Sequence, residues 1–163
     1  MAHPISVLGA IHTALSLIPV LAGVAAFIRY GRIDPGNGLG KIYVGGMFAS
    51  VVTSFGLSST GHFNPGHALG ILALIAVLAG MFAPRIGFLG RAGVYLQTLA
   101  LSFSFFLLLV PGTNETLSRL PVDHPLASGI DSPVVQSALT GLFALFLIGT
   151  AYQMFMLARQ RRG

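Results

Sequence analysis

Long uncharged apolar runs are the feature that most constrains this sequence. A helix rises 1.5 Å per residue, so about 20 apolar residues cross the roughly 30 Å hydrocarbon core of a bilayer. Five runs of about that length are free of charge near their centres, and they cover residues 5–28, 42–59, 66–83, 86–110 and 134–158. Because these runs are continuously apolar, with no period-two alternation, we predict helices and not the strands of a barrel.

Composition supports a single all-α integral membrane domain over residues 1–163. Hydrophobic residues make up 54% of the chain and charged residues 8%, whereas about 25% of a soluble domain is charged. The net charge is +5, but the basic residues stand at the ends of the apolar runs and form no basic face. We therefore expect contact with the lipid bilayer and no nucleic-acid binding. The absence of cysteine excludes disulfides and iron–sulfur clusters.

The basic residues also predict an orientation. If each run crosses the membrane, Arg119 alone among the nine Lys and Arg residues falls on one side. The positive-inside rule then predicts a five-transmembrane-helix bundle with the N-terminus outside and the C-terminus in the cytoplasm. The longest connection, residues 111–133, holds Glu115, Asp123 and Asp131 together with four prolines. We expect it to be an exposed periplasmic loop.

The histidines are the most informative polar residues, because all five fall on the predicted outer side. His12 lies about 10 Å into the first run by helical rise, where an ionisable side chain is costly without a partner. We expect it to face the bundle and to bond a hydroxyl, and the nearby candidates are Thr13, Ser16 and Thr53.

Imidazoles from different helices can ligate haem or a metal ion without any cysteine. The candidate cofactor ligands are His12 and His67, for haem b, and the candidate metal ligands are His12, His62 and His67. Two other readings stay open. His62 and His67 can serve the turn between the second and third runs, and His12 can take part in proton transfer or face a quinone.

Small and polar residues predict how the helices pack. Gly66, Gly70, Ala73 and Gly80 give the third run a small face that lets a neighbouring helix approach closely. The fourth run carries a polar stripe, and such stripes usually form hydrogen bonds between helices: Gln97, Thr98, Ser102 and Ser104. The centres of all runs lack Asp, Glu, Lys and Arg, which argues against an ordinary ion-coupled transporter.

Four segments occur in a recognisable order. They are the early His12, GLGKIYVGGM at 38–47, NPGHALGILAL at 64–74 and LLLVPG at 107–112. Together they resemble an uncharacterised bacterial family described as "predicted membrane protein", a multi-span domain of unknown function. Its second helix opens with a His-x-x-x-Gly-x-x-Tyr-like motif. The resemblance covers roughly residues 8–112.

The resemblance implies histidines at three positions. His67 matches the one at the start of the third helix, while Gly36 and Arg91 stand near the positions of the other two. If the family's histidines form a metal or haem site, this chain has lost part of that site. The resemblance implies no activity.

The sequence carries no motif for a nucleotide loop, a zinc protease or a nucleophile elbow. We therefore expect a non-catalytic integral membrane subunit or small-molecule-binding module in the bacterial inner membrane. Its partners would be other membrane protein subunits or further copies of the chain. The alternative is a haem or metal redox protein that uses the histidines of the outer side, and a second alternative is a small transporter.

Overall fold

The computed structural model describes residues 6–57 and 65–160, and these ranges contain helices and turns without any strand. The predicted all-helical class is therefore confirmed. The described residues form five α-helices: α1 Val7–Tyr30, α2 Gly38–Ser54, α3 Pro65–Phe82, α4 Ala92–Arg119 and α5 Pro133–Gln160. Three short 3-10 turns accompany them: η1 Phe55–Leu57, η2 Ala83–Arg85 and η3 Gly87–Leu89.

Four of the described helices are long and apolar enough to cross a membrane. They are α1, α3 together with η2, α4 and α5, and the mean hydropathy of their most apolar windows lies between 1.8 and 2.1. Helix α2 has 17 residues, or about 26 Å of helix, slightly less than the roughly 30 Å bilayer core. The chain therefore has the character of a membrane protein. That α2 also crosses the membrane, as a fifth span, stays a prediction.

Two helices begin at residues that the apolar runs did not predict. Helix α2 begins at Gly38 and not at residue 42, because the side chain of Asn37 accepts a hydrogen bond from Gly40 N–H at 2.9 Å and caps the helix. Helix α4 begins at Ala92 and not at residue 86. Gly90, just before it, has a φ of 45°, which breaks the helical path.

The predicted loop over residues 111–133 is wrong for residues 111–119, which continue helix α4 to Arg119. Pro111 lies inside the helix. It removes one backbone donor, but the helical hydrogen bonds before and after it let the helix continue. Beyond the proline, the Thr116 hydroxyl donates to the Gly112 carbonyl at 2.7 Å, and Glu115 pairs with Arg119 one turn later. The connection between α4 and α5 is correspondingly shorter than predicted and covers residues 120–132.

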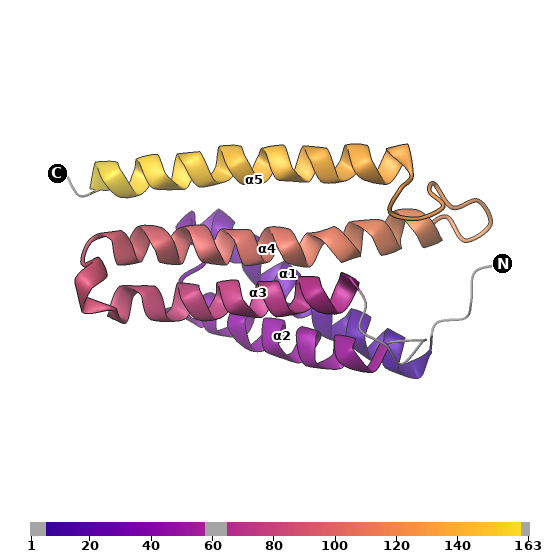
Figure 1. Cartoon of the computed structure of the whole chain (residues 1–163), viewed down its shortest axis with the longest axis horizontal. Helices are drawn as coiled ribbons and strands as arrows, with labels where there is room; N and C mark the ends of the chain where they lie inside the picture. The colour runs from indigo at the N-terminus through magenta and orange to yellow at the C-terminus, as the bar shows by residue number, and fades with distance from the viewer. Residues whose placement is uncertain (1–5, 58–64, 161–163) are drawn as a thin grey trace.

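The helices run up and down along one long axis (Figure 1). The α1–α2 connection, the α3–α4 connection and the C-terminal end of α5 lie together, and we call this the basic end. Its described basic residues are Arg29, Arg32, Lys41, Arg85, Arg91 and Arg159. The opposite end, which we call the acidic end, holds the start of α1 and the α4–α5 connection. Its charged residues are Glu115, Arg119, Asp123 and Asp131.

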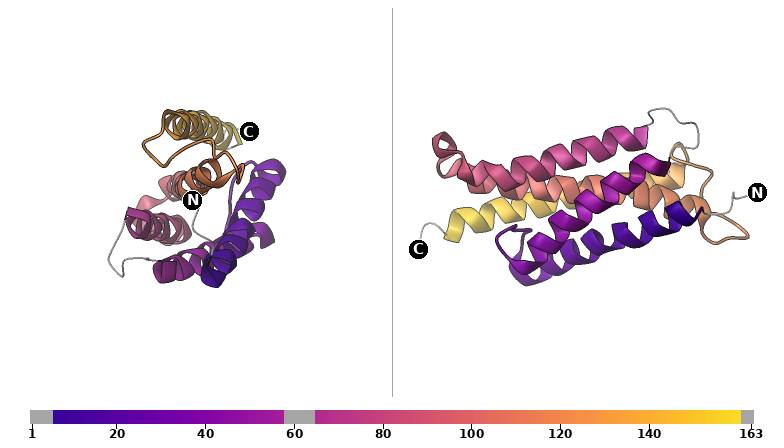
Figure 2. Two further views of the ribbon diagram at one scale, coloured as in Figure 1. Left: turned by 90° about the vertical axis from the view of Figure 1, so that its right-hand side faces the viewer. Right: turned by 90° about the horizontal axis from the view of Figure 1, so that it is seen from below.

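Helix α4 is central to the bundle, because it packs on α1, α3 and α5. Helix α5 has extensive contacts with α4 alone, and it lies on the far side of α4 from α2 and α3 (Figure 2). Only Val135, Gln153 and Leu157 are buried on α5. One helix is thus attached to the outside of a more compact group of four.

Close approach of the four helices depends on glycines. A Cβ at Gly80 on α3 would lie 2.6 Å from Leu101 Cγ on α4, and a Cβ at Gly46 on α2 would lie 2.7 Å from Pro19 Cδ on α1. Of the predicted small face on α3, Ala73 is buried, whereas Gly66 is exposed. A Cβ at Gly70 would lie 3.1 Å from Val51 Cγ1.

Candidate functional site

His12 lies between α1 and α2 near the acidic end. Its Nδ1 is 2.9 Å from the Thr53 hydroxyl oxygen, because α1 and α2 run antiparallel and the second turn of α1 faces the last turn of α2. Ser16, one turn further along α1, bonds the Ser50 hydroxyl of α2 at 2.6 Å. Of the three candidate hydroxyls, Thr53 makes the shorter bond to the His12 ring and Ser16 lies 3.4 Å from it.

The hydrogen bonds around Thr53 favour one tautomer of His12. The Thr53 hydroxyl oxygen lies 2.9 Å from the Ala49 and Ser50 carbonyls of its own helix, so its single hydrogen is directed to the backbone. It then accepts the hydrogen of His12 Nδ1. The neutral imidazole therefore keeps a lone pair on Nε2, which is 3.4 Å from the Ser16 oxygen. Such a nitrogen can ligate a metal or accept a proton.

His67 is held by a different set of contacts. It lies in the first turn of α3, is 6% exposed, and stacks on the ring of Phe55 in η1 at 4.9 Å between ring centroids. Thr53 and Phe55 are two residues apart, so both histidines are held at the C-terminal end of α2. His12 bonds a hydroxyl there, while His67 lies against an aromatic ring.

The predicted three-histidine metal site is incomplete in the described part of the chain. His62 lies outside the described residues, and those residues contain no group of three His, Cys, Asp or Glu side chains that could hold a metal. Gly36 and Arg91, which the family resemblance pairs with His67, belong to the connections of the basic end. The three positions therefore lie at opposite ends of the fold and form no common site.

The polar stripe of α4 bonds three other helices, as predicted. Gln97 donates to the Gly80 carbonyl of α3 at 3.1 Å, and Ser104 bonds the Tyr43 hydroxyl of α2 at 2.7 Å. Ser102 donates to the side-chain oxygen of Gln153 on α5 at 2.8 Å. Thr98 differs, because its hydroxyl bonds the Val94 carbonyl of its own helix.

Gln153 joins three helices at the basic end, a role that the sequence did not reveal. Its side-chain oxygen accepts from Ser102 on α4, and its amide nitrogen donates to the Gly31 carbonyl at the end of α1, both at 2.8 Å. Gly31 has a φ of 71° and ends α1 in the left-handed conformation. A glutamine in an apolar run is the only sequence signal for this contact.

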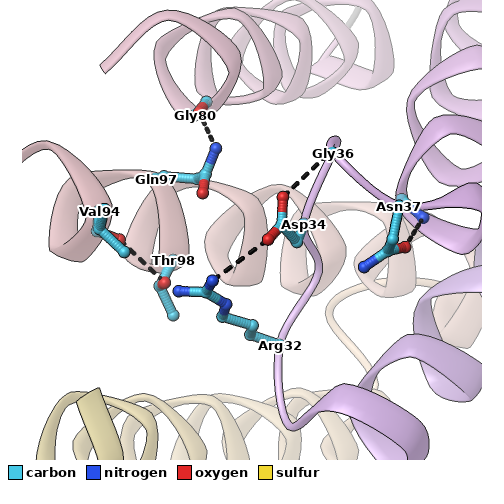
Figure 3. A network of polar contacts seen from close by, with 9 residues as sticks. Arg32, Asp34, Gly36, Asn37, Gly80, Val94, Gln97 and Thr98 are labelled. Carbon is cyan, nitrogen blue, oxygen red and sulfur yellow. Dashed lines mark hydrogen bonds and ion pairs between the residues drawn. The ribbon is translucent and has the colours of Figure 1, made fainter. Parts of the chain in front are cut away.

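A second polar cluster follows directly in the α1–α2 connection (Figure 3). The Arg32 guanidinium bonds one Asp34 carboxylate oxygen at 3.2 Å, and the other accepts from the Gly36 backbone N–H at 2.8 Å. Nη1 of Arg32 is buried and has no hydrogen-bond partner among the described residues. Figure 3 shows this side chain directed toward α4 near Thr98.

A cavity of about 470 Å³ opens beside this cluster, between the end of α1 and the end of α5. Its lining residues are Tyr30, Gly31, Arg32, Asp34, Asn37, Tyr152, Gln153, Met156, Leu157 and Gln160. The structure thus presents two polar sites, one around His12 near the acidic end and one around Arg32 at the basic end.

Comparison with known proteins adds no assignment to either site. No protein-family model matches the chain, and no curated protein or solved structure matches it. The resemblance to the uncharacterised bacterial family stays a prediction.

Proposed function

We propose that this chain is a non-catalytic integral membrane subunit that works within a larger membrane assembly. The observation that carries the proposal is the isolation of α5. Its most apolar window is 6% buried within the chain, against 44% for α4. Lipid alone covers such a face in a monomer, so a second feature of α5 is needed to favour a protein partner.

That second feature is a pair of glycines with open surroundings. Gly141 and Gly149 are eight residues apart on α5, and a Cβ at either position would meet nothing within 4 Å. Glycine costs helix stability, and in membrane helices it is concentrated where another helix packs closely. Neither glycine serves a contact within the described chain. A transmembrane helix of another subunit, or of a second copy, is the occupant that fits this face.

The orientation of the proposed subunit follows from its charges. The described residues of the basic end carry six Lys or Arg side chains and one acid, Asp34. The positive-inside rule supports a cytoplasmic basic end and a periplasmic acidic end in the bacterial inner membrane. A reporter enzyme fused to the C-terminus should be active in the cytoplasm. Activity on the periplasmic side would overturn this orientation.

Site-specific cross-linking in native membranes tests the partner face. The chain has no cysteine, so Leu145→Cys on α5 introduces one defined position for a benzophenone cross-linker. Leu21→Cys on α1 is a matched control, because Leu21 is 68% exposed and Leu145 is 66% exposed. We expect illumination to give a discrete protein adduct from position 145 and none from position 21.

Two further variants decide whether the adduct reports close helix packing. Gly141→Leu and Gly149→Leu should abolish it, because the added side chains hold the partner helix away. Gly112→Leu is the control, since Gly112 is also helical and also has nothing within 4 Å. Lipid-only products from both cysteines, or an adduct that survives both Gly141→Leu and Gly149→Leu, would refute a partner on α5.

A histidine-ligated haem or metal redox protein is the second candidate, and it is favoured by the Nε2 of His12, whose hydrogen bond with Ser16 is 3.4 Å long. The purified protein would then show a haem absorption band or a stoichiometric metal that disappears in His12→Ala. If the purified wild-type protein is colourless and metal-free, and His12→Ala leaves its haem and metal content unchanged, this candidate is ruled out.

A further inference from the structure

We propose that the cavity at the basic end binds a phosphate group that approaches from the membrane interface. The inference rests on the proposed function only in requiring that the helices span a membrane. It needs no partner subunit. Its chemistry is carried by Arg32 and by the residues of α1 and α5 that face one another across the cavity.

The cavity has the size of a small-molecule site. Its volume of about 470 Å³ falls within the roughly 300–1,000 Å³ typical of ligand pockets. One wall comes from the end of α1 and the α1–α2 connection, and the other from the last turns of α5. Gln153 spans the two walls through its bond to the Gly31 carbonyl. The cavity is therefore a half-open cleft whose two walls are joined by Gln153.

The hydrogen-bonding capacity of Arg32 is only partly used within the described residues. Asp34 takes one contact from its guanidinium, at 3.2 Å, while Nη1 is buried without a partner among the described residues. The Asp34 carboxylate is itself occupied on both oxygens, by Arg32 and by the Gly36 N–H. The Arg32 side chain is still 28% exposed, so an anion beside its exposed part would gain further hydrogen bonds, and guanidinium groups bind phosphate oxygens well.

The surrounding charges favour the same ligand. Arg29 lies next to Tyr30, with its guanidinium 5.5 Å from the centre of that ring, and Arg159 is adjacent to Gln160. Asp34 is the one carboxylate at the basic end among the described residues. An anion that enters the cavity thus meets a positive local potential.

The remaining lining residues suit a group that is polar on one side and apolar on the other. Met156 and Leu157 provide apolar surface, whereas Asn37, Gln153 and Gln160 provide amides. Tyr30 and Tyr152 combine both properties and are typical of the membrane–water interface. Basic pockets between transmembrane helices on the cytoplasmic side bind the head groups of anionic lipids. A phosphate can come from such a lipid or from a soluble phosphate ester.

Native mass spectrometry of the full-length protein tests the proposal. The protein would be released from nanodiscs of phosphatidylcholine alone or of phosphatidylcholine with phosphatidylglycerol, and the retained lipid counted. We expect phosphatidylglycerol to be retained at least fivefold more than phosphatidylcholine. Two variants should lose this preference. Arg32→Gln removes the charge, and Met156→Trp fills the cavity while leaving the Arg32 and Asp34 pair in place.

Arg119→Gln is the control, because it removes an arginine from the opposite end of the molecule and should leave retention unchanged. Glycerol 3-phosphate distinguishes the sources: displacement of the lipid by millimolar ester supports a soluble phosphate ligand, and failure to displace it supports a membrane lipid. Equal retention of both lipids by the wild-type protein would overturn the proposal. A preference that survives either Arg32→Gln or Met156→Trp would also overturn it, even if cross-linking on α5 succeeds.

Discussion

Gln153 is the side chain whose loss should most specifically loosen α5. It is 7% exposed and makes two hydrogen bonds of 2.8 Å, one from Ser102 on α4 and one to the Gly31 carbonyl at the end of α1. Gln153→Leu keeps the side-chain volume roughly constant and removes both bonds. The perturbation therefore isolates the polar contribution.

The magnitude follows from interhelical hydrogen bonds in membranes. Such bonds contribute about 0.6 kcal/mol on average and about 1.7 kcal/mol at most, so two of them set a range of about 1–3 kcal/mol. Ser102 can redirect its hydroxyl to a carbonyl of its own helix, which offsets part of the loss. We expect Gln153→Leu to lower the free energy of unfolding by about 1–2 kcal/mol.

Reversible unfolding in mixed micelles, followed by circular dichroism, measures this change. Gln136→Leu is the matched control, because Gln136 is on the same helix but is exposed and bonds only the nearby Ile130 carbonyl. A double-mutant cycle with Ser102→Ala isolates the bond between Ser102 and Gln153. Equal effects of the two leucine substitutions, or a cycle with no coupling, would refute the assigned role of Gln153.

Two other substitutions test the packing and the His12 site. Gly80→Ala should destabilise the protein by about 1–3 kcal/mol in the same assay, since its Cβ would overlap Leu101, whereas Gly112→Ala has open space and should be neutral or stabilising. Thr53→Val removes the acceptor of His12 Nδ1–H. Nitrogen-15 NMR of the labelled imidazole should show Nδ1–H in the wild type and a shift toward Nε2–H in the variant, and a wild-type Nε2–H signal would contradict the assignment.

Much of the fold was predictable because the length of an apolar run indicates whether a helix can cross a membrane. The fifth run, predicted over residues 134–158, differs from α5 by two residues or fewer at either end. The helix boundaries predicted from the runs were wrong where polar side chains bond the backbone. Asn37 starts α2 early by capping it, and residues beyond Pro111 continue α4 through local side-chain bonds that hydropathy does not register.

The His12 site was partly predictable for a similar reason. A histidine inside an apolar run needs a partner, and Thr53 was one of three candidate hydroxyls, with Thr13 and Ser16, that the sequence offered. The Gln153 contact at the basic end was not predictable, because it joins Gly31 to Gln153, which are 122 residues apart in the chain. Only the packing of α5 on α4 brings these residues together.

Helix α5 forms one wall of the cavity and also presents the outer face on which Gly141 and Gly149 lie. Its extensive contacts within the chain are with α4 alone, so a small shift of α5 would change the cavity mainly through α4 and the Gln153–Gly31 bond. Thermodynamic linkage then makes the two faces interdependent. If phosphate and a partner helix both bind, and each favours a particular position of α5, phosphate would change the affinity for that helix, and the helix would change the affinity for phosphate by the same factor.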